Sequence, residues 1–150
     1  MPIYVDGDAC PVKDEVVRVA ERYDEKVFIV SNGGLRPHRH PLVESIYVAE
    51  GPDVADDWIA ERAADGDIVI TADIPLAHRC VTAGASVLKP NGSQLDTTNI
   101  GSILATRNLM ADLRDTGAIT SRVAEFTQRD RSNFLQALDR ALRSTSNQKR

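Results

Sequence analysis

Aspartates follow short apolar runs at three separate places in the sequence. Asp6 and Asp8 come directly after IYV, the segment GPDVADD comes after SIYVAE, and Asp73 comes after IVITA. Carboxylates gathered in one cleft repel each other unless a cation neutralises them. Hard oxygen ligands of this kind suit Mg²⁺ or Mn²⁺, which activate water and stabilise phosphoryl oxygens. The aspartates therefore predict a metal site that acts on phosphate esters.

The spacing of the aspartates supports a shared site. Asp6 and Asp8 are two residues apart, so both side chains can point to one side of a strand end. Asp53 lies three residues before Asp56 and four before Asp57, so either pair can share a helix face. We predict that the catalytic residues are Asp6, Asp8, Asp56 and Asp73, and that the metal ligands are Asp6, Asp53, Asp56, Asp57 and Asp73.

Capping or turn chemistry is the alternative explanation for each of these aspartates. Asp53 and Asp73 each precede an expected helix, where a carboxylate accepts hydrogen bonds from the first free N–H groups. Asp56 and Asp57 would lie in a first helical turn, where the helix dipole favours anions. Capping explains any one of them alone, but it does not explain why they meet at one edge of a sheet.

Several other polar residues could contact the substrate. Guanidinium and ammonium groups suit phosphate oxygens. The candidate substrate- or phosphate-binding residues are Lys13, Asn32, Arg36, Arg39 and Thr71. A solvated loop would explain the basic residues equally well, and Thr71 could simply end a strand.

Apolar periodicity and breaker residues predict the elements that position these side chains. We expect strands at 2–6, 27–31, 45–49, 67–71 and 85–89, and helices at 12–23, 53–66, 74–83, 102–115 and 130–143. This alternation is typical of an α/β protein with a mostly parallel sheet and helices on both faces. Ligands of such sheets bind beyond the carboxyl ends of the strands, where the aspartates lie.

Length and composition limit the class of protein. The chain of 150 residues suits one domain, and its net charge of −4 argues against a passive nucleic-acid binder. The charge does not exclude a metal-dependent enzyme, because a bound cation reverses the local field. No apolar run approaches the ~20 residues of a membrane span, and no signal peptide is recognisable. We therefore expect a cytoplasmic protein with no membrane partner.

Four motifs together resemble one protein family. DGDACPVKDEV, GPDVADDWIAERA, GDIVITADIPLA and DRSNFLQALDRALR occur in order along nearly the whole chain. They are similar to the bacterial YaiI/YqxD family of uncharacterised proteins, which is grouped with the PIN-like domains. The resemblance implies a three-layer α/β/α, Rossmann-like domain over residues 1–144 with about five strands and extra C-terminal helices, and a flexible tail at 145–150.

The resemblance also implies an activity. Many PIN-like domains are Mg²⁺- or Mn²⁺-dependent nucleases that act on RNA or on DNA flaps. By position, their acidic residues correspond to Asp6, Asp56 and Asp73 here. Asp8, Asp53 and Asp57 are additional to that pattern.

Three functions remain open from the sequence. The leading hypothesis is a metal-dependent nuclease, with RNA as the expected substrate. The D-x-D pair Asp6 and Asp8 also resembles the nucleophile motif of haloacid-dehalogenase-like phosphatases, but Asp56 and Asp57 precede Thr71 in an order that does not match. The third hypothesis is a non-catalytic RNA- or protein-binding domain with a vestigial site, whose amphipathic C-terminal helix could form a homodimer.

Overall fold

The computed structural model describes residues 2–7, 12–31, 40–49, 54–103, 105 and 127–148, without the side chains of 144–148. Several predicted residues lie outside these ranges, namely Asp8, Asn32, Arg36, Arg39 and Asp53. Most of the helix expected at 102–115 also lies outside the described residues, and only 102, 103 and 105 are described as helical.

A six-stranded sheet forms the centre of the molecule, in the order β3-β2-β1-β4-β5-β6. The strands are β1 (Ile3–Asp6), β2 (Val27–Ser31), β3 (Val43–Tyr47), β4 (Ile68–Ile70), β5 (Ser86–Leu88) and β6 (Gln94–Leu95). Every pair is parallel except β5 and β6. The predicted mostly parallel sheet is confirmed. β3 begins two residues earlier than predicted, and the short edge strand β6 was not predicted.

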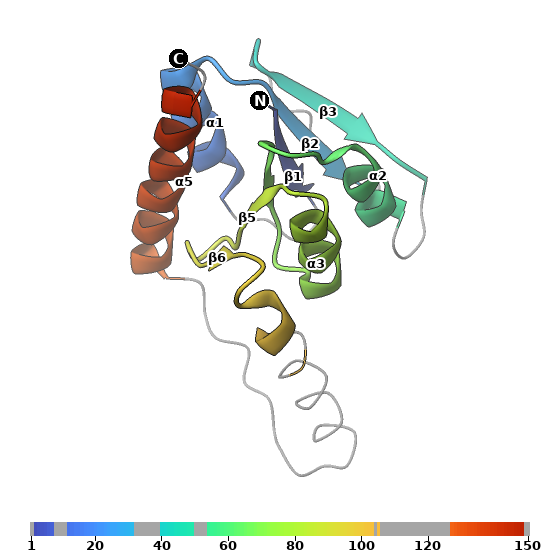
Figure 1. Ribbon diagram of the computed structural model, residues 1–150. Coiled ribbons are helices and arrows are strands. Elements are labelled where there is room, and N and C mark those ends of the chain that lie inside the picture. The colour runs from blue at the N-terminus through green and yellow to red at the C-terminus, as the bar shows by residue number, and fades with distance from the viewer. Residues whose placement is uncertain are drawn as a thin grey trace.

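Helices cover both faces of the sheet, which confirms the three-layer α/β/α architecture (Figure 1). The helices with full bounds are α1 (Lys13–Tyr23), α2 (Val54–Arg62), α3 (Ile74–Thr82) and α5 (Gln128–Gln148). α1 and α5 lie on one face, and α2 and α3 lie on the other. α5 continues past residue 144, where the resemblance places the end of the domain, to Gln148.

Alternation along β1 decides which face each side chain joins. Ile3 and Val5 belong to the core cluster that contains the buried residues of α1 and α5, whereas Tyr4 belongs to the cluster that contains those of α2 and α3. Successive side chains of a strand point to opposite faces. The side chain of Asp6, the next residue, therefore emerges on the α2 and α3 face.

α1 and α5 pack side by side and run in the same direction. The hydroxyl of Tyr23 donates to Asp139 at 2.9 Å, and Arg131 donates to Glu15 at 3.0 Å. Both contacts join residues 116 positions apart, which fixes one constant register between the helices. The apolar side of α5 is buried in the core at Phe134, Leu138 and Leu142, with Leu135 partly buried.

α2 is held against the opposite face by apolar and aromatic contacts. Ala55 and Ile59 are buried there. The ring of Trp58 lies edge-on to Tyr4 at 6.1 Å, and the guanidinium of Arg62 lies 4.0 Å from the centre of the Trp58 ring. These contacts fix the helix whose first turn carries Asp56 and Asp57.

Candidate active site at the carboxyl edge of the sheet

The strand order reverses between β1 and β4. From β1 the chain moves outward to β2 and β3, and it then returns to β4 on the other side of β1. Such a reversal opens a crevice at the carboxyl ends of the two strands, where open α/β sheets bind their ligands. Val5 pairs with Ile70, so the next residues, Asp6 and Thr71, lie side by side at this edge of the sheet.

A short hydrogen-bond chain links the two strand ends. The backbone N–H of Asp73 donates to the Thr71 hydroxyl oxygen at 3.0 Å, and the Thr71 hydroxyl donates to the Oδ2 carboxylate oxygen of Asp6 at 3.1 Å. The direction is set by the first bond, because an N–H can only donate and leaves the hydroxyl proton for Asp6. The chain therefore holds Asp6 as a hydrogen-bond acceptor.

Buried polar side chains concentrate at this edge. Among the described residues, those classed as buried and polar are Asp6, Ser31 and Thr71, which are 6%, 2% and 1% exposed. They stand at or directly after the carboxyl ends of three neighbouring strands, β1, β2 and β4. Burying a carboxylate is unfavourable unless hydrogen bonds or charges compensate it. A buried aspartate at a ligand-binding edge is therefore a candidate for function.

Asp73 caps α3, as the capping interpretation predicted. Its Oδ1 oxygen accepts a hydrogen bond from the Leu76 backbone N–H at 3.0 Å, and Pro75 occupies the first turn. The cap directs one carboxylate oxygen toward the helix while the backbone N–H of the same residue binds Thr71. Asp73 is thus joined to Asp6 through Thr71, and its capping role does not exclude a second role at the site.

Asp56 and Asp57 lie in the first turn of α2, near α3. Arg79 on α3 donates to the Oδ1 oxygen of Asp57 at 2.7 Å, with both side chains largely exposed. This hydrogen bond, together with the negative charges of Asp57 and Asp56, raises the pKa of Arg79. Arg79 was not singled out from the sequence, because a contact between residues 22 positions apart on different helices leaves no local pattern.

Cys80 lies beside this acidic pair but is not a reactive thiol. Burial, together with the negative charge of Asp56, raises the pKa of Cys80 to about 11. Cys80 is therefore protonated at neutral pH. Because only the thiolate is a strong nucleophile, the protonated thiol is inert. Among the residues that the structure describes, the buried polar groups of this edge are one carboxylate and two hydroxyls, which are hard oxygen donors that suit a hard cation.

The described residues do not by themselves complete a metal site. Within the ranges that the structure describes, no three His, Cys, Asp or Glu side chains are close enough together to hold a metal ion. Asp8 and Asp53, which the sequence assigns to the same edge, lie outside those ranges. Asp6 and Asp73 fit a metal site in two respects: both carry carboxylates, and both lie at the carboxyl edge of the sheet. The ligand set stays a prediction.

The remaining predicted residue within the described ranges is Lys13. It is the first residue of α1, which follows the carboxyl end of β1. This places Lys13 at the same end of the sheet as Asp6.

In the part of the chain that the structure describes, no helix is long and apolar enough to cross a membrane.

The site lies within a region that a known family matches. Residues 4–144 match the family described as uncharacterised, YaiI/YqxD. This chain belongs to the YaiI/YqxD family. The match includes β1, β4 and the first turn of α2, so the elements that carry Asp6, Thr71 and Asp56 are all part of the family's common domain.

Relatives of similar length occur in several bacteria. A UPF0178 protein of Cereibacter sphaeroides strain ATCC 17029 is 60% identical over 142 residues, which cover 94% of this chain and 88% of the relative. UPF0178 proteins of Rhodopseudomonas palustris strain TIE-1 and Nitrobacter winogradskyi are each 59% identical over 141 residues, with 89% and 90% of those relatives covered. No solved structure is significantly similar to this chain.

Proposed function

We propose that this YaiI/YqxD-family protein is a divalent-metal-dependent nuclease that hydrolyses phosphodiester bonds of RNA. The observation that carries the proposal is the buried Asp6 carboxylate at the point where the strand order reverses, with the Thr71 hydroxyl bound to it at 3.1 Å. A buried carboxylate held in place by a neighbouring strand end is what a metal ligand requires. We further propose a cytoplasmic location, where RNA is available.

Asp6, Asp56 and Asp73 would hold Mg²⁺ or Mn²⁺, and Asp8, Asp53 or Asp57 would complete the ligand set. The ion would supply an activated water and would stabilise the charge on the phosphoryl oxygens. Thr71 orients Asp6 by donating to one carboxylate oxygen, in the way that outer hydrogen bonds usually orient metal ligands. Asp73 gains a fixed position from its capping bond to Leu76.

The chain's own cations would bind the substrate backbone. Lys13 begins α1 at the same end of the sheet, and Arg36, Arg39 and Asn32 belong to the connection between β2 and β3. Basic side chains position a nucleic acid through its phosphates without reading its sequence. The proposed enzyme would therefore have little intrinsic sequence preference at these contacts.

The test is cleavage of a labelled single-stranded RNA with Mn²⁺, with Mg²⁺ and with EDTA. The variants are Asp6→Asn and Asp73→Asn, because asparagine keeps an oxygen for Thr71 at position 6 and a capping oxygen at position 73. Both variants therefore keep the fold and lose only a carboxylate charge. The matched control is Asp139→Asn on α5, which removes one carboxylate far from this edge.

We expect metal-dependent cleavage by the wild type and by Asp139→Asn. Asp6→Asn should lose at least about 100-fold in activity, because losing a ligand should cost no less than the roughly 10–100-fold typical of losing a ligand's hydrogen-bond partner. Cleavage that survives EDTA or both site variants would contradict the proposal. Release of phosphate from a small monoester without RNA cleavage would instead support the phosphatase hypothesis. RNA binding without cleavage would support a non-catalytic domain.

A further inference from the structure

A pocket lies on the opposite face of the sheet from Asp6. Its volume is about 550 Å³, and it lies between α5 and the strands β5 and β6, of which β6 is the edge of the sheet. Small-molecule sites in proteins typically measure about 300–1,000 Å³. The α5–β5 pocket, as we call it, is lined by Asp65, Gly66, Gly84, Ser86, Leu88, Gly92, Gln94, Ala137, Arg140 and Ala141.

Small residues on both walls leave room for the pocket. Ala137 and Ala141 face it from α5, and Ser86 faces it from β5. The turn at Gly92 closes one end, since the backbone there has a φ of +93° and comes so near to α5 that an added Cβ would lie 2.7 Å from the carbonyl carbon of Asn133. The pocket is therefore built into the packing of α5 on the sheet edge.

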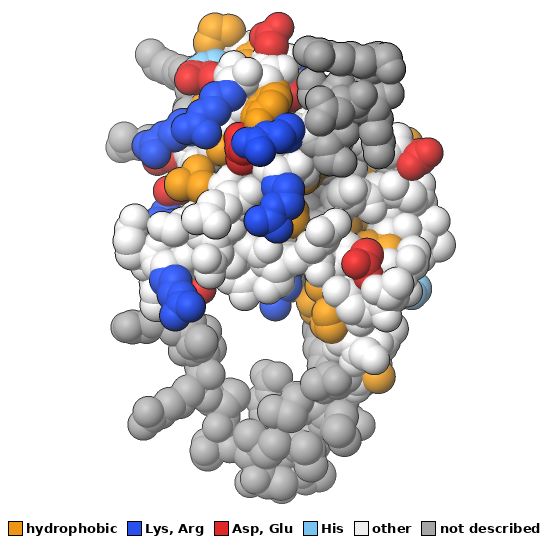
Figure 2. All heavy atoms as spheres, turned by 60° about the vertical axis from the view of Figure 1, so that its left-hand side comes forward, with side chains coloured by type: hydrophobic (Ala, Val, Ile, Leu, Met, Phe, Trp, Pro, Cys, Tyr) orange, Lys and Arg blue, Asp and Glu red, His pale blue; other side chains and the backbone are white. Residues whose placement is uncertain are grey.

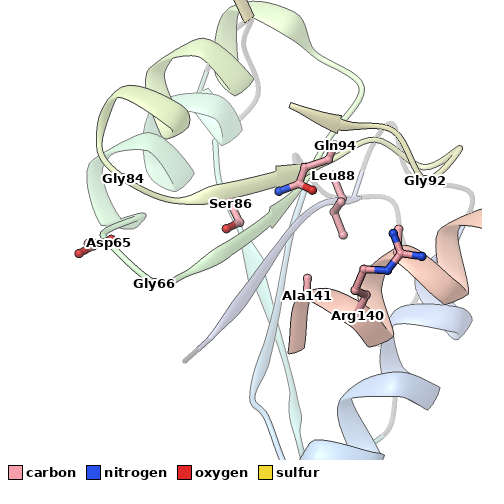
Figure 3. Close-up of a pocket in the computed structure, with 10 residues that line it drawn as sticks. Asp65, Gly66, Gly84, Ser86, Leu88, Gly92, Gln94, Arg140 and Ala141 are labelled. Atoms are coloured by element: carbon pink, nitrogen blue, oxygen red, sulfur yellow. The ribbon is translucent and has the colours of Figure 1, made fainter. Parts of the chain in front are cut away.

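Three hydrogen-bonding side chains line the pocket without partners of their own. In the described part of the chain, the guanidinium of Arg140, the carboxamide of Gln94 and the hydroxyl of Ser86 make no hydrogen bond or ion pair. Figure 3 shows Ser86 and Gln94 on the strand side of the pocket, with Arg140 on α5 opposite. These groups are free to bind a ligand.

Arg140 differs in this respect from other arginines of α1 and α5. Lys and Arg side chains spread over the face that Figure 2 turns forward, with Asp and Glu side chains between them. Arg22 and Arg143 both pair with Asp139, and Arg131 pairs with Glu15. Arg140 stands beside the pocket without such a neighbour, so its charge is not neutralised by the protein in the described residues.

We propose that the α5–β5 pocket binds a small polar molecule that carries an oxyanion, either phosphate or carboxylate, at Arg140. The planar guanidinium fits two oxygens of such a group at once, and Gln94 adds a neutral donor. Asp65 lies at the other end of the pocket, near Gly66 and Gly84, and its carboxylate points away from Arg140 (Figure 3), so it leaves the charge of Arg140 available to the ligand. The proposal does not depend on a metal at Asp6.

The test is calorimetric titration of the full chain with adenosine 5′-monophosphate, inorganic phosphate and malate. The first variant is Arg140→Gln, and its matched control is Arg129→Gln, an exposed arginine on the same helix that does not line the pocket. The second variant is Ala137→Leu, which fills the pocket from α5. Circular dichroism would check that both variants are folded.

We expect at least one of these probes to bind the wild type and Arg129→Gln, and to lose at least about tenfold in affinity in Arg140→Gln, the scale of one charge-assisted hydrogen bond. Ala137→Leu should weaken binding of the same probe, because its side chain takes up the volume that the ligand needs. A preference for the phosphates over malate would identify a phosphate ligand, and the reverse would identify a carboxylate. No binding of any probe at a concentration of about 10 mM, which would detect a Kd of about 1 mM, would overturn the proposal. An equal loss of affinity in Arg140→Gln and Arg129→Gln would overturn it as well.

Discussion

The Thr71 hydroxyl lies 3.1 Å from the Oδ2 oxygen of Asp6, across the boundary between β4 and β1. The two residues are 65 positions apart in the chain, and both are buried. This contact joins the two strands at which the sheet order reverses. It makes Asp6 a fixed carboxylate at the place where a sheet of this kind binds its ligand.

Replacing Thr71 with Val would remove this contact without changing the shape of the side chain much. Asp6 would lose its donor and the Asp73 N–H would lose its acceptor, so we expect the free energy of unfolding to fall by about 1–3 kcal/mol. Urea denaturation of Thr71→Val measures the loss. Thr71→Ser keeps the hydroxyl and serves as the control. If the valine variant were as stable as the serine variant, the hydrogen-bond chain would have no energetic role.

Replacing Arg79 with Gln would leave the acidic edge more negative. Arg79 pairs with Asp57 on the surface, so the change in stability should stay below about 1 kcal/mol. Removing a positive charge near Asp56 and Asp57 should tighten Mn²⁺ binding by about threefold to tenfold at low salt. Calorimetry in about 20 mM salt, inside the weakly screened range, would test this.

The control for Arg79→Gln is Arg18→Gln on α1, which removes the same charge on the other face of the sheet. Equal Mn²⁺ affinities in the two variants would mean that Arg79 does not influence the acidic edge.

Cys80 should make the protein less stable at alkaline pH. Burial raises the pKa of the Cys80 thiol in the folded state to about 11, whereas the pKa of a thiol in an unfolded chain is about 8.5. Between these values the folded state holds a proton that the unfolded state has released. The stabilisation is therefore complete below the unfolded pKa and is lost as the pH rises through about 11.

The difference in unfolding free energy between the wild type and Cys80→Ala, measured from pH 8 to pH 10.5, isolates this effect. The raised pKa of Tyr4 contributes equally to both proteins and cancels. We expect the wild type to lose stability more steeply as the pH rises. Parallel curves for the two proteins would show that the thiol is not protected by burial.

Gly92 should tolerate no side chain. Its φ of +93° is a left-handed conformation, and a Cβ there would lie 2.7 Å from the carbonyl carbon of Asn133. We expect Gly92→Ala to lower the free energy of unfolding by about 1–3 kcal/mol. Gly101→Ala is the control, because a Cβ added at Gly101 would meet nothing within 4 Å and alanine favours a helix. Similar stabilities for the two variants would contradict the close packing of this turn on α5.

The sequence predicted most of the helices and strands, because the apolar periodicity and capping residues that mark them lie within short stretches of the chain. Apolar runs located β1, β2 and β4, and the Asp73-Ile74-Pro75 sequence located the cap of α3. β3 was placed two residues late, because its burial pattern is mixed and its exposed positions give no clean period. The two-residue strand β6 is too short for any periodic signal.

The site was only partly predictable for a different reason. That Asp6, Thr71 and Asp73 share one edge follows from parallel strands, but their direct hydrogen-bond chain depends on the neighbouring positions of β1 and β4 in the strand order. The ion pair of Asp57 with Arg79 and the position of Arg140 beside its pocket depend on how the helices pack. No spacing along the chain encodes those contacts.

The most direct test of the proposed metal site is calorimetric binding of Mn²⁺ and Mg²⁺ to the wild type and to Asp6→Asn. Asparagine keeps the acceptor for Thr71, so the variant should fold while lacking one negative ligand. We predict binding to the wild type in or below the millimolar range and a loss of at least about tenfold in the variant. No binding to the wild type at millimolar metal, or equal affinity in both proteins, would contradict a metal site at Asp6.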